Sequence, residues 1–165
     1  MFPSELLNGI ILLVYALAVP TYVRPVHGLI TLTAVLFGVA AIPLYYALRG
    51  SNEVGSKVAV FLMEVAIVIF IVADVVLTLG LITPVNHAFT YVAGNSLFLI
   101  GVLISGVIML KGVFYKWVRY LSIVTGLVGL ITNVPPPSGI VARAALLLLA
   151  TWSLAMGYNM RKFAK

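Results

Sequence analysis

Two carboxylic acids, Glu64 and Asp74, lie inside one long apolar stretch of the sequence. A carboxyl group in the middle of a membrane helix costs on the order of 2.5–3.5 kcal/mol, so it normally faces protein or water and often has a function. Ten residues of helix separate the two acids by roughly 15 Å, which is too far for a shared proton. The spacing disfavours a paired-carboxylate catalytic site and is compatible with two stations of a proton or cation route, bridged by water.

The two acids share one broad side of this predicted helix. They lie about 80° apart around the helix axis, with Ile67, Ile71 and Thr78 on the same face. One side of the helix is therefore predicted to face the interior of the protein.

The next apolar stretch offers a hydrogen-bond partner for each acid. In an antiparallel pair of helices, Asn95 falls near the depth of Asp74, and Ser105 falls near the depth of Glu64. Such bonds would serve a transport route, or they would only tie two helices together with protonated carboxyls. The small residues that permit close approach of the two helices are Gly94, Gly101 and Ser105.

A second polar group is predicted at one end of the helices: Arg24, His27, Asn86, His87 and Arg143. If the imidazoles of the two histidines met, they could ligate a b-type haem or hold a quinone headgroup, with an arginine at the propionates. A histidine at the start of a span is also common as an interfacial residue. An ion pair from Asp74 to Arg24 or Arg143 is the simpler alternative and would keep the acid charged. We expect no metal site and no cofactor.

The composition decides where these residues lie. Hydrophobic residues make up 63% of the chain, charged residues 8%, and the mean hydropathy is +1.20. Ten Lys and Arg with four Asp and Glu cannot cover a 165-residue globule in polar side chains, so the outer surface must face lipid. The net charge of +6 sits at the ends of apolar runs, which is typical of membrane topology and not of nucleic-acid binding. The absence of cysteine excludes disulfides, thiolate metal sites and cysteine nucleophiles.

Apolar stretches of a length suited to crossing a bilayer occur six times. We predict a single all-α membrane domain over residues 1–165, a bundle of six transmembrane helices, and we expect the first span to be retained and not removed as a signal peptide. A polar loop at 49–57 and an interfacial stretch at 111–119 separate some of the spans. The fifth span is the shortest, so it can cross the membrane only if it includes residues of the interfacial stretch, tilts little or ends against protein. The predicted spans are 6–23, 27–48, 58–81, 87–110, 120–134 and 140–160.

Positive charges orient this bundle. Six spans place eight Lys and Arg on one side of the membrane and only Arg24 and Arg143 on the other. Because positive residues favour the cytoplasmic side, both termini are predicted to be cytoplasmic. The alternative is five spans plus a re-entrant segment, which would give five charges against five. We therefore prefer six spans in the cell membrane.

The sequence leaves three functions open. The first is a small transporter or channel, as a homo-oligomer, in which the intramembrane acids carry protons or cations. The second is an accessory subunit of a larger membrane assembly, such as a respiratory complex, because short loops leave little except packing against partners. The third is a redox subunit with haem or quinone at His27 and His87. No serine–histidine–acid pattern and no zinc-protease motif is present, so we do not expect an enzyme.

Overall fold

Helices make up nearly all of the structure. The computed structural model describes residue 10 and residues 27–112, 114–133 and 139–160. Within these residues there is no strand, which confirms the predicted all-α bundle. The first predicted span, 6–23, lies outside the described residues except for Ile10. The described helices are α2 (His27–Leu48), α3 (Glu53–Thr78), α4 (Pro84–Met109), α5 (Lys116–Thr132) and α6 (Gly139–Met160).

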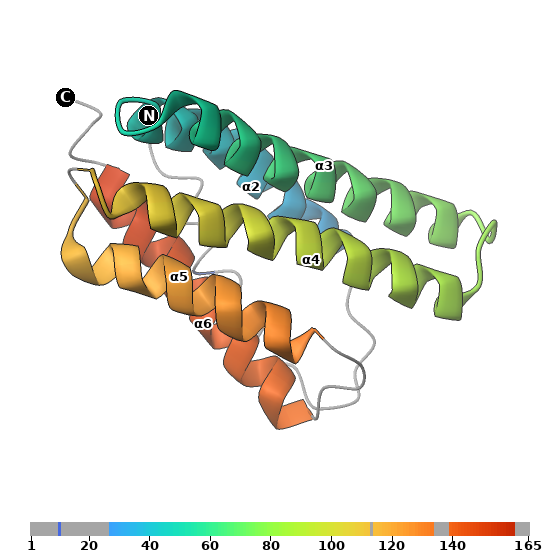
Figure 1. Ribbon diagram of the computed structural model, residues 1–165. Helices are drawn as coiled ribbons and strands as arrows, with labels where there is room; N and C mark the ends of the chain where they lie inside the picture. Colours follow the sequence, from blue (N-terminus) through green and yellow to red (C-terminus); the bar gives the residue numbers. More distant parts are fainter. Residues whose placement is uncertain (1–9, 11–26, 113, 134–138, 161–165) are drawn as a thin grey trace.

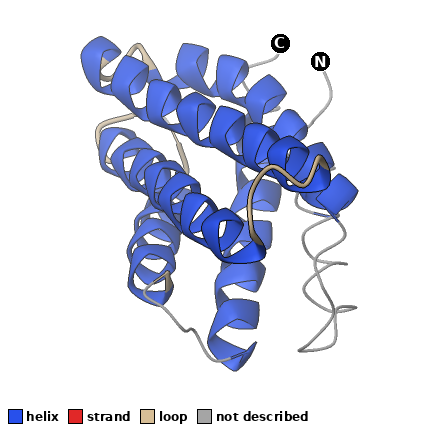
Figure 2. Cartoon of the chain, turned by 90° about the vertical axis from the view of Figure 1, so that its right-hand side faces the viewer, coloured by secondary structure: helices blue, strands red, loops and turns tan. Residues whose placement is uncertain are grey.

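Successive helices run antiparallel and pack side by side. α3 packs between α2 and α4, α4 packs between α3 and α5, and α6 lies against α5 (Figure 1). α2 also contacts α6, so the described helices surround a common core. The described part of the bundle contains helices and their connecting turns but no strand (Figure 2).

An aromatic group from three helices lies at the centre of this core. The rings of Phe37 on α2 and Phe98 on α4 are 4.7 Å apart between centroids, and Trp152 on α6 lies within 6.4 Å of both. The indole Nε1 of Trp152 donates a hydrogen bond of 2.8 Å to the Ser122 hydroxyl on α5. Trp152 is completely buried, and this hydrogen bond satisfies its polar atom inside the core.

Glycines bring three of the helices into close contact, as the sequence predicts. A Cβ added to Gly101 on α4 would lie 2.7 Å from the backbone oxygen of Ala59 on α3, and one on Gly94 would lie 2.9 Å from the Phe70 ring. A Cβ on Gly126 of α5 would lie 2.9 Å from the Leu103 backbone of α4. The α3–α4 and α4–α5 interfaces therefore depend on glycine, which has no side chain, at these positions.

Capping residues set helix ends that differ from the predicted spans. α3 begins at Glu53, five residues before the predicted start, because the Asn52 side chain accepts a 2.9 Å hydrogen bond from the Gly55 N–H and caps the helix. α4 begins at Pro84 because Thr83 caps it, and the turn before it uses Gly80 at φ 71°. α5 begins at Lys116, and so takes residues from the predicted interfacial stretch.

Two described stretches are suited to crossing a membrane by length and composition, Glu53–Thr78 and Phe89–Met109. The described apolar stretches in α2 and α6, Ala34–Leu48 and Ala144–Met160, are shorter, and α5 has 17 residues. The helical bundle is confirmed, whereas the number of six spans stays a prediction.

Candidate functional site

Glu64 lies near the middle of the 26-residue α3 and faces α2. Its carboxyl atom Oε2 is 3.5 Å from the point where a Cβ would stand on Gly38, and the Ile67 side chain reaches the same point to 3.8 Å. The carboxyl therefore lies against the surface of α2 beside Gly38. Within the described residues, the Glu64 carboxyl takes part in no hydrogen bond or ion pair, and its side chain is partly buried.

Asp74 occupies a different environment, one helical turn before the end of α3. Its side chain is 3% exposed, and its backbone carbonyl accepts a 2.7 Å hydrogen bond from the Thr78 hydroxyl. The predicted inward face is confirmed for Ile67 and Asp74, which are buried, and is wrong for Thr78, which is exposed. Since ten residues of continuous helix separate the two acids, they form two sites and not one.

Asn95 and Ser105 do not bond to the acids for which they were predicted as partners, whereas the predicted ion pair of Asp74 with Arg24 or Arg143 involves side chains outside the described part. Asn95 donates its 3.0 Å hydrogen bond to the Asn133 side chain, and Ser105 donates 2.9 Å to the carbonyl of Gly101 on its own helix. The physical reason is the register of the α3–α4 hairpin. Because Gly101 faces Ala59 and Met63, Ser105 lies nearer the start of α3 than Glu64 does.

Asn133 is a polar residue whose role the sequence reasoning missed. Its amide nitrogen donates to the Val92 carbonyl at 2.9 Å and to the Ser96 hydroxyl at 2.6 Å, while its oxygen accepts from Asn95. The residue caps the C-terminus of α5 and ties that end to the middle of α4. The sequence feature that indicates this role is an asparagine shortly before three consecutive prolines at 135–137. It lies at the end of the shortest predicted span, which has to end against protein.

The predicted outer cluster falls largely on residues whose side chains are not described. Arg24 lies outside the described residues. His27, His87 and Arg143 lie in α2, α4 and α6, each near the N-terminal end of its helix, but their side chains are likewise outside the described part. Asn86 is exposed in the first turn of α4, where its carbonyl accepts a 2.9 Å hydrogen bond from Thr90. Haem or quinone ligation therefore stays a prediction, and the described residues contain no group of three or more metal-ligating side chains.

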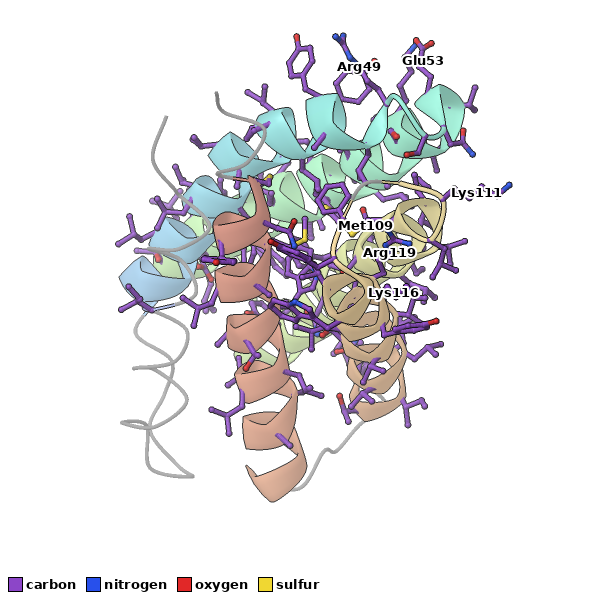
Figure 3. The ribbon with its side chains drawn as sticks, turned by 90° about the vertical axis from the view of Figure 1, so that its left-hand side faces the viewer. Arg49, Glu53, Met109, Lys111, Lys116 and Arg119 are labelled. Atoms are coloured by element: carbon purple, nitrogen blue, oxygen red, sulfur yellow. The ribbon has the colours of Figure 1, made fainter. Side chains whose placement is uncertain are left out.

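The described basic side chains gather at one end of the bundle. Figure 3 shows Arg49 and Glu53 at the α2–α3 turn and Lys111, Lys116 and Arg119 at the α4–α5 turn. Lys57 is the fifth described cation, and its ammonium group pairs with the Glu53 carboxylate at 2.7 Å. These five are all the Lys and Arg residues whose side chains the structure describes.

Arg119 has a structural role at this end. Its Nε donates to the Phe114 carbonyl at 2.7 Å, its Nη1 to the Leu110 carbonyl at 3.0 Å and its Nη2 to the Gly112 carbonyl at 2.6 Å. Since the last carbonyls of a helix lack partners within the helix, this guanidinium satisfies the end of α4 and fixes the turn to α5.

Comparison with protein-family models, curated proteins and solved structures gives no match to this chain. The candidate site consists of a carboxyl near the middle of α3, a buried acid near the end of that helix, and a basic end of the bundle.

Proposed function

We propose that the chain is a multi-pass membrane protein that carries protons or small cations by way of Glu64. The observation that carries the proposal is the Glu64 carboxyl near the middle of an apolar helix, against Gly38, with no hydrogen-bond or ion-pair partner among the described residues. The proposal has three parts: the membrane placement, its orientation and the role of the carboxyl.

The exposed surface supports the membrane placement. Large apolar side chains are exposed along the helices, and Val68, near the middle of α3, is 58% exposed. At 1.5 Å per residue, the 26 residues of α3 measure roughly 39 Å, which exceeds the hydrocarbon thickness of about 30 Å. Lipid is a suitable solvent for such side chains, which include Val39, Ile42, Phe61, Val68, Val72, Leu127 and Ile131.

The basic end supports the orientation. α2 and α4 end there, α3 and α5 begin there, and the helix α6 ends toward it (Figure 1). Because Lys and Arg favour the cytoplasmic side, this end is proposed as cytoplasmic. Six spans, with residues 6–23 as the first, then put both termini in the cytoplasm, and the tail adds Arg161, Lys162 and Lys165.

The surroundings of Glu64 support the role of the carboxyl. A neutral carboxyl is far cheaper in an apolar site than a carboxylate, so binding a proton stabilises the group where it lies. Releasing that proton requires water or a cation at the same atom. The carboxyl has no hydrogen-bond or ion-pair partner among the described residues, so its oxygens are left for such a partner. Glu64 is therefore proposed as the binding group, with Asp74 as a second station nearer the opposite end.

The direct test is proton flux in liposomes that contain the purified chain and an internal pH-sensitive dye. An imposed potassium diffusion potential should acidify the wild-type liposomes, and Glu64→Gln should lower the initial rate at least tenfold, because the amide cannot release a proton. Glu53→Gln, at the exposed start of α3, is the matched control and should keep the wild-type rate.

Unchanged flux in Glu64→Gln, with the circular dichroism spectrum of the wild type, would refute the transport role. A second function, an accessory subunit of a larger membrane complex, is favoured by the exposed apolar faces of α2 and α3. It predicts no flux from the purified chain and large partners that co-purify with it from mild detergent.

A further inference from the structure

We infer that the α4–α5 corner binds the headgroup of an anionic phospholipid, with the acyl chains along the outer face of α5. We define this lipid corner by Lys111, Lys116, Trp117 and Tyr120. The inference rests on the membrane placement proposed above, and it does not depend on transport through Glu64.

Uncompensated positive charge is the first observation. Lys111 and Lys116 are exposed, and neither ammonium group has a hydrogen-bond or ion-pair partner among the described residues. The nearby guanidinium of Arg119 adds a third charge, although its N–H groups are taken up by backbone carbonyls. The described acid at this end of the bundle, Glu53, is already paired with Lys57 at 2.7 Å.

The neighbouring corner, between α2 and α3, differs in this respect. There the Arg49 guanidinium stacks 4.7 Å above the Tyr46 ring, and Lys57 pairs with Glu53 at 2.7 Å. Both cations are therefore already engaged within the protein. An anionic headgroup gains more from Lys111 and Lys116, which have no partner to lose among the residues that the structure describes.

The outer face of α5 identifies the anion as a lipid. Trp117 and Tyr120 are 51% and 61% exposed and follow Lys116 in the first turns of α5, and such aromatic side chains are typical of the headgroup level. The exposed apolar residues Val124, Leu127 and Ile131 follow along the helix at spacings of four, three and four residues. They continue one stripe from Tyr120 toward the membrane interior. A soluble phosphate would use the lysines alone, whereas a phospholipid uses the lysines and this apolar stripe.

The test measures quenching of tryptophan fluorescence by brominated lipids in nanodiscs that contain the full chain. Trp117 is exposed, whereas Trp152 is completely buried and supplies an emission that lipid does not reach. Brominated phosphatidylglycerol should quench Trp117 at lower mole fraction than brominated phosphatidylcholine, with roughly fivefold preference from each lysine. Lys111→Gln/Lys116→Gln should remove the preference, and Lys57→Gln should keep it within about twofold of the wild type.

The outcomes separate this inference from the membrane placement. Equal quenching by both lipids, or a preference that survives in the double variant, would overturn the lipid corner and leave the bilayer placement standing. If neither lipid quenches Trp117, the placement fails and the lipid corner fails with it. Inorganic phosphate should not compete with phosphatidylglycerol, and competition would overturn the assignment to a lipid.

Discussion

Trp152→Ala should lower the free energy of unfolding by about 3–5 kcal/mol, the range for removing a large aromatic side chain from a packed core. The indole is completely buried against the rings of Phe37 and Phe98, so its removal leaves a cavity where three helices meet. It also removes the hydrogen bond from Nε1 to Ser122. Thermal unfolding in detergent, followed by far-ultraviolet circular dichroism, measures the loss.

A second tryptophan provides the matched control. Trp117 is half exposed at the basic end, so Trp117→Ala should change the melting temperature by a few degrees at most. Trp152→Phe keeps most of the ring area and loses the N–H donor, and it should therefore cost less than Trp152→Ala. Equal destabilisation by Trp152→Ala and Trp117→Ala would contradict the position of Trp152 at the centre of the bundle.

Gly101→Val should have the second largest effect on stability, toward the upper end of the range of about 1–3 kcal/mol for overpacking. The first added carbon would lie 2.7 Å from both the Ala59 backbone oxygen and the Met63 Cγ. A backbone atom cannot move aside as a flexible side chain can, so α3 and α4 have to separate. The same melting experiment measures the loss, together with any shift toward oligomers on size exclusion.

The control for this substitution lies in the α2–α3 turn. A Cβ on Gly50 would meet no atom within 4 Å, so Gly50→Val should leave the melting temperature close to that of the wild type. If Gly101→Val is as stable as Gly50→Val, the α3–α4 interface is not packed through Gly101.

Hydropathy was sufficient to find the helices but not to fix their ends. The predicted span 27–48 has the same bounds as α2. The predicted polar loop at 49–57 contains the first turn of α3, because Asn52 accepts a hydrogen bond at the helix start and allows Glu53 and Lys57 to be helical. Polar residues at a helix start look like a loop when only apolar length is considered.

The same displaced ends explain the wrong partners of the acids. The predicted fourth span begins at residue 87, whereas α4 begins at Pro84. The prediction therefore shifts α4 along α3 and pairs the wrong residues. The periodicity of α3 correctly predicted that Asp74 is buried, whereas Glu64 is partly buried. It could not predict that Glu64 meets Gly38, because one helix gives the direction of a side chain but not which neighbouring helix covers it.

The membrane placement of the whole bundle is the central claim, and accessibility from each side of the membrane tests it most directly. The chain has no cysteine, so Asn86→Cys and Lys111→Cys each introduce one thiol, at exposed positions on opposite ends of α4. A maleimide that cannot cross membranes is applied to right-side-out and to inverted membrane vesicles. We expect the thiol at position 86 to be labelled only in right-side-out vesicles and the thiol at position 111 only in inverted vesicles. Labelling of both thiols from the same side would contradict the membrane placement.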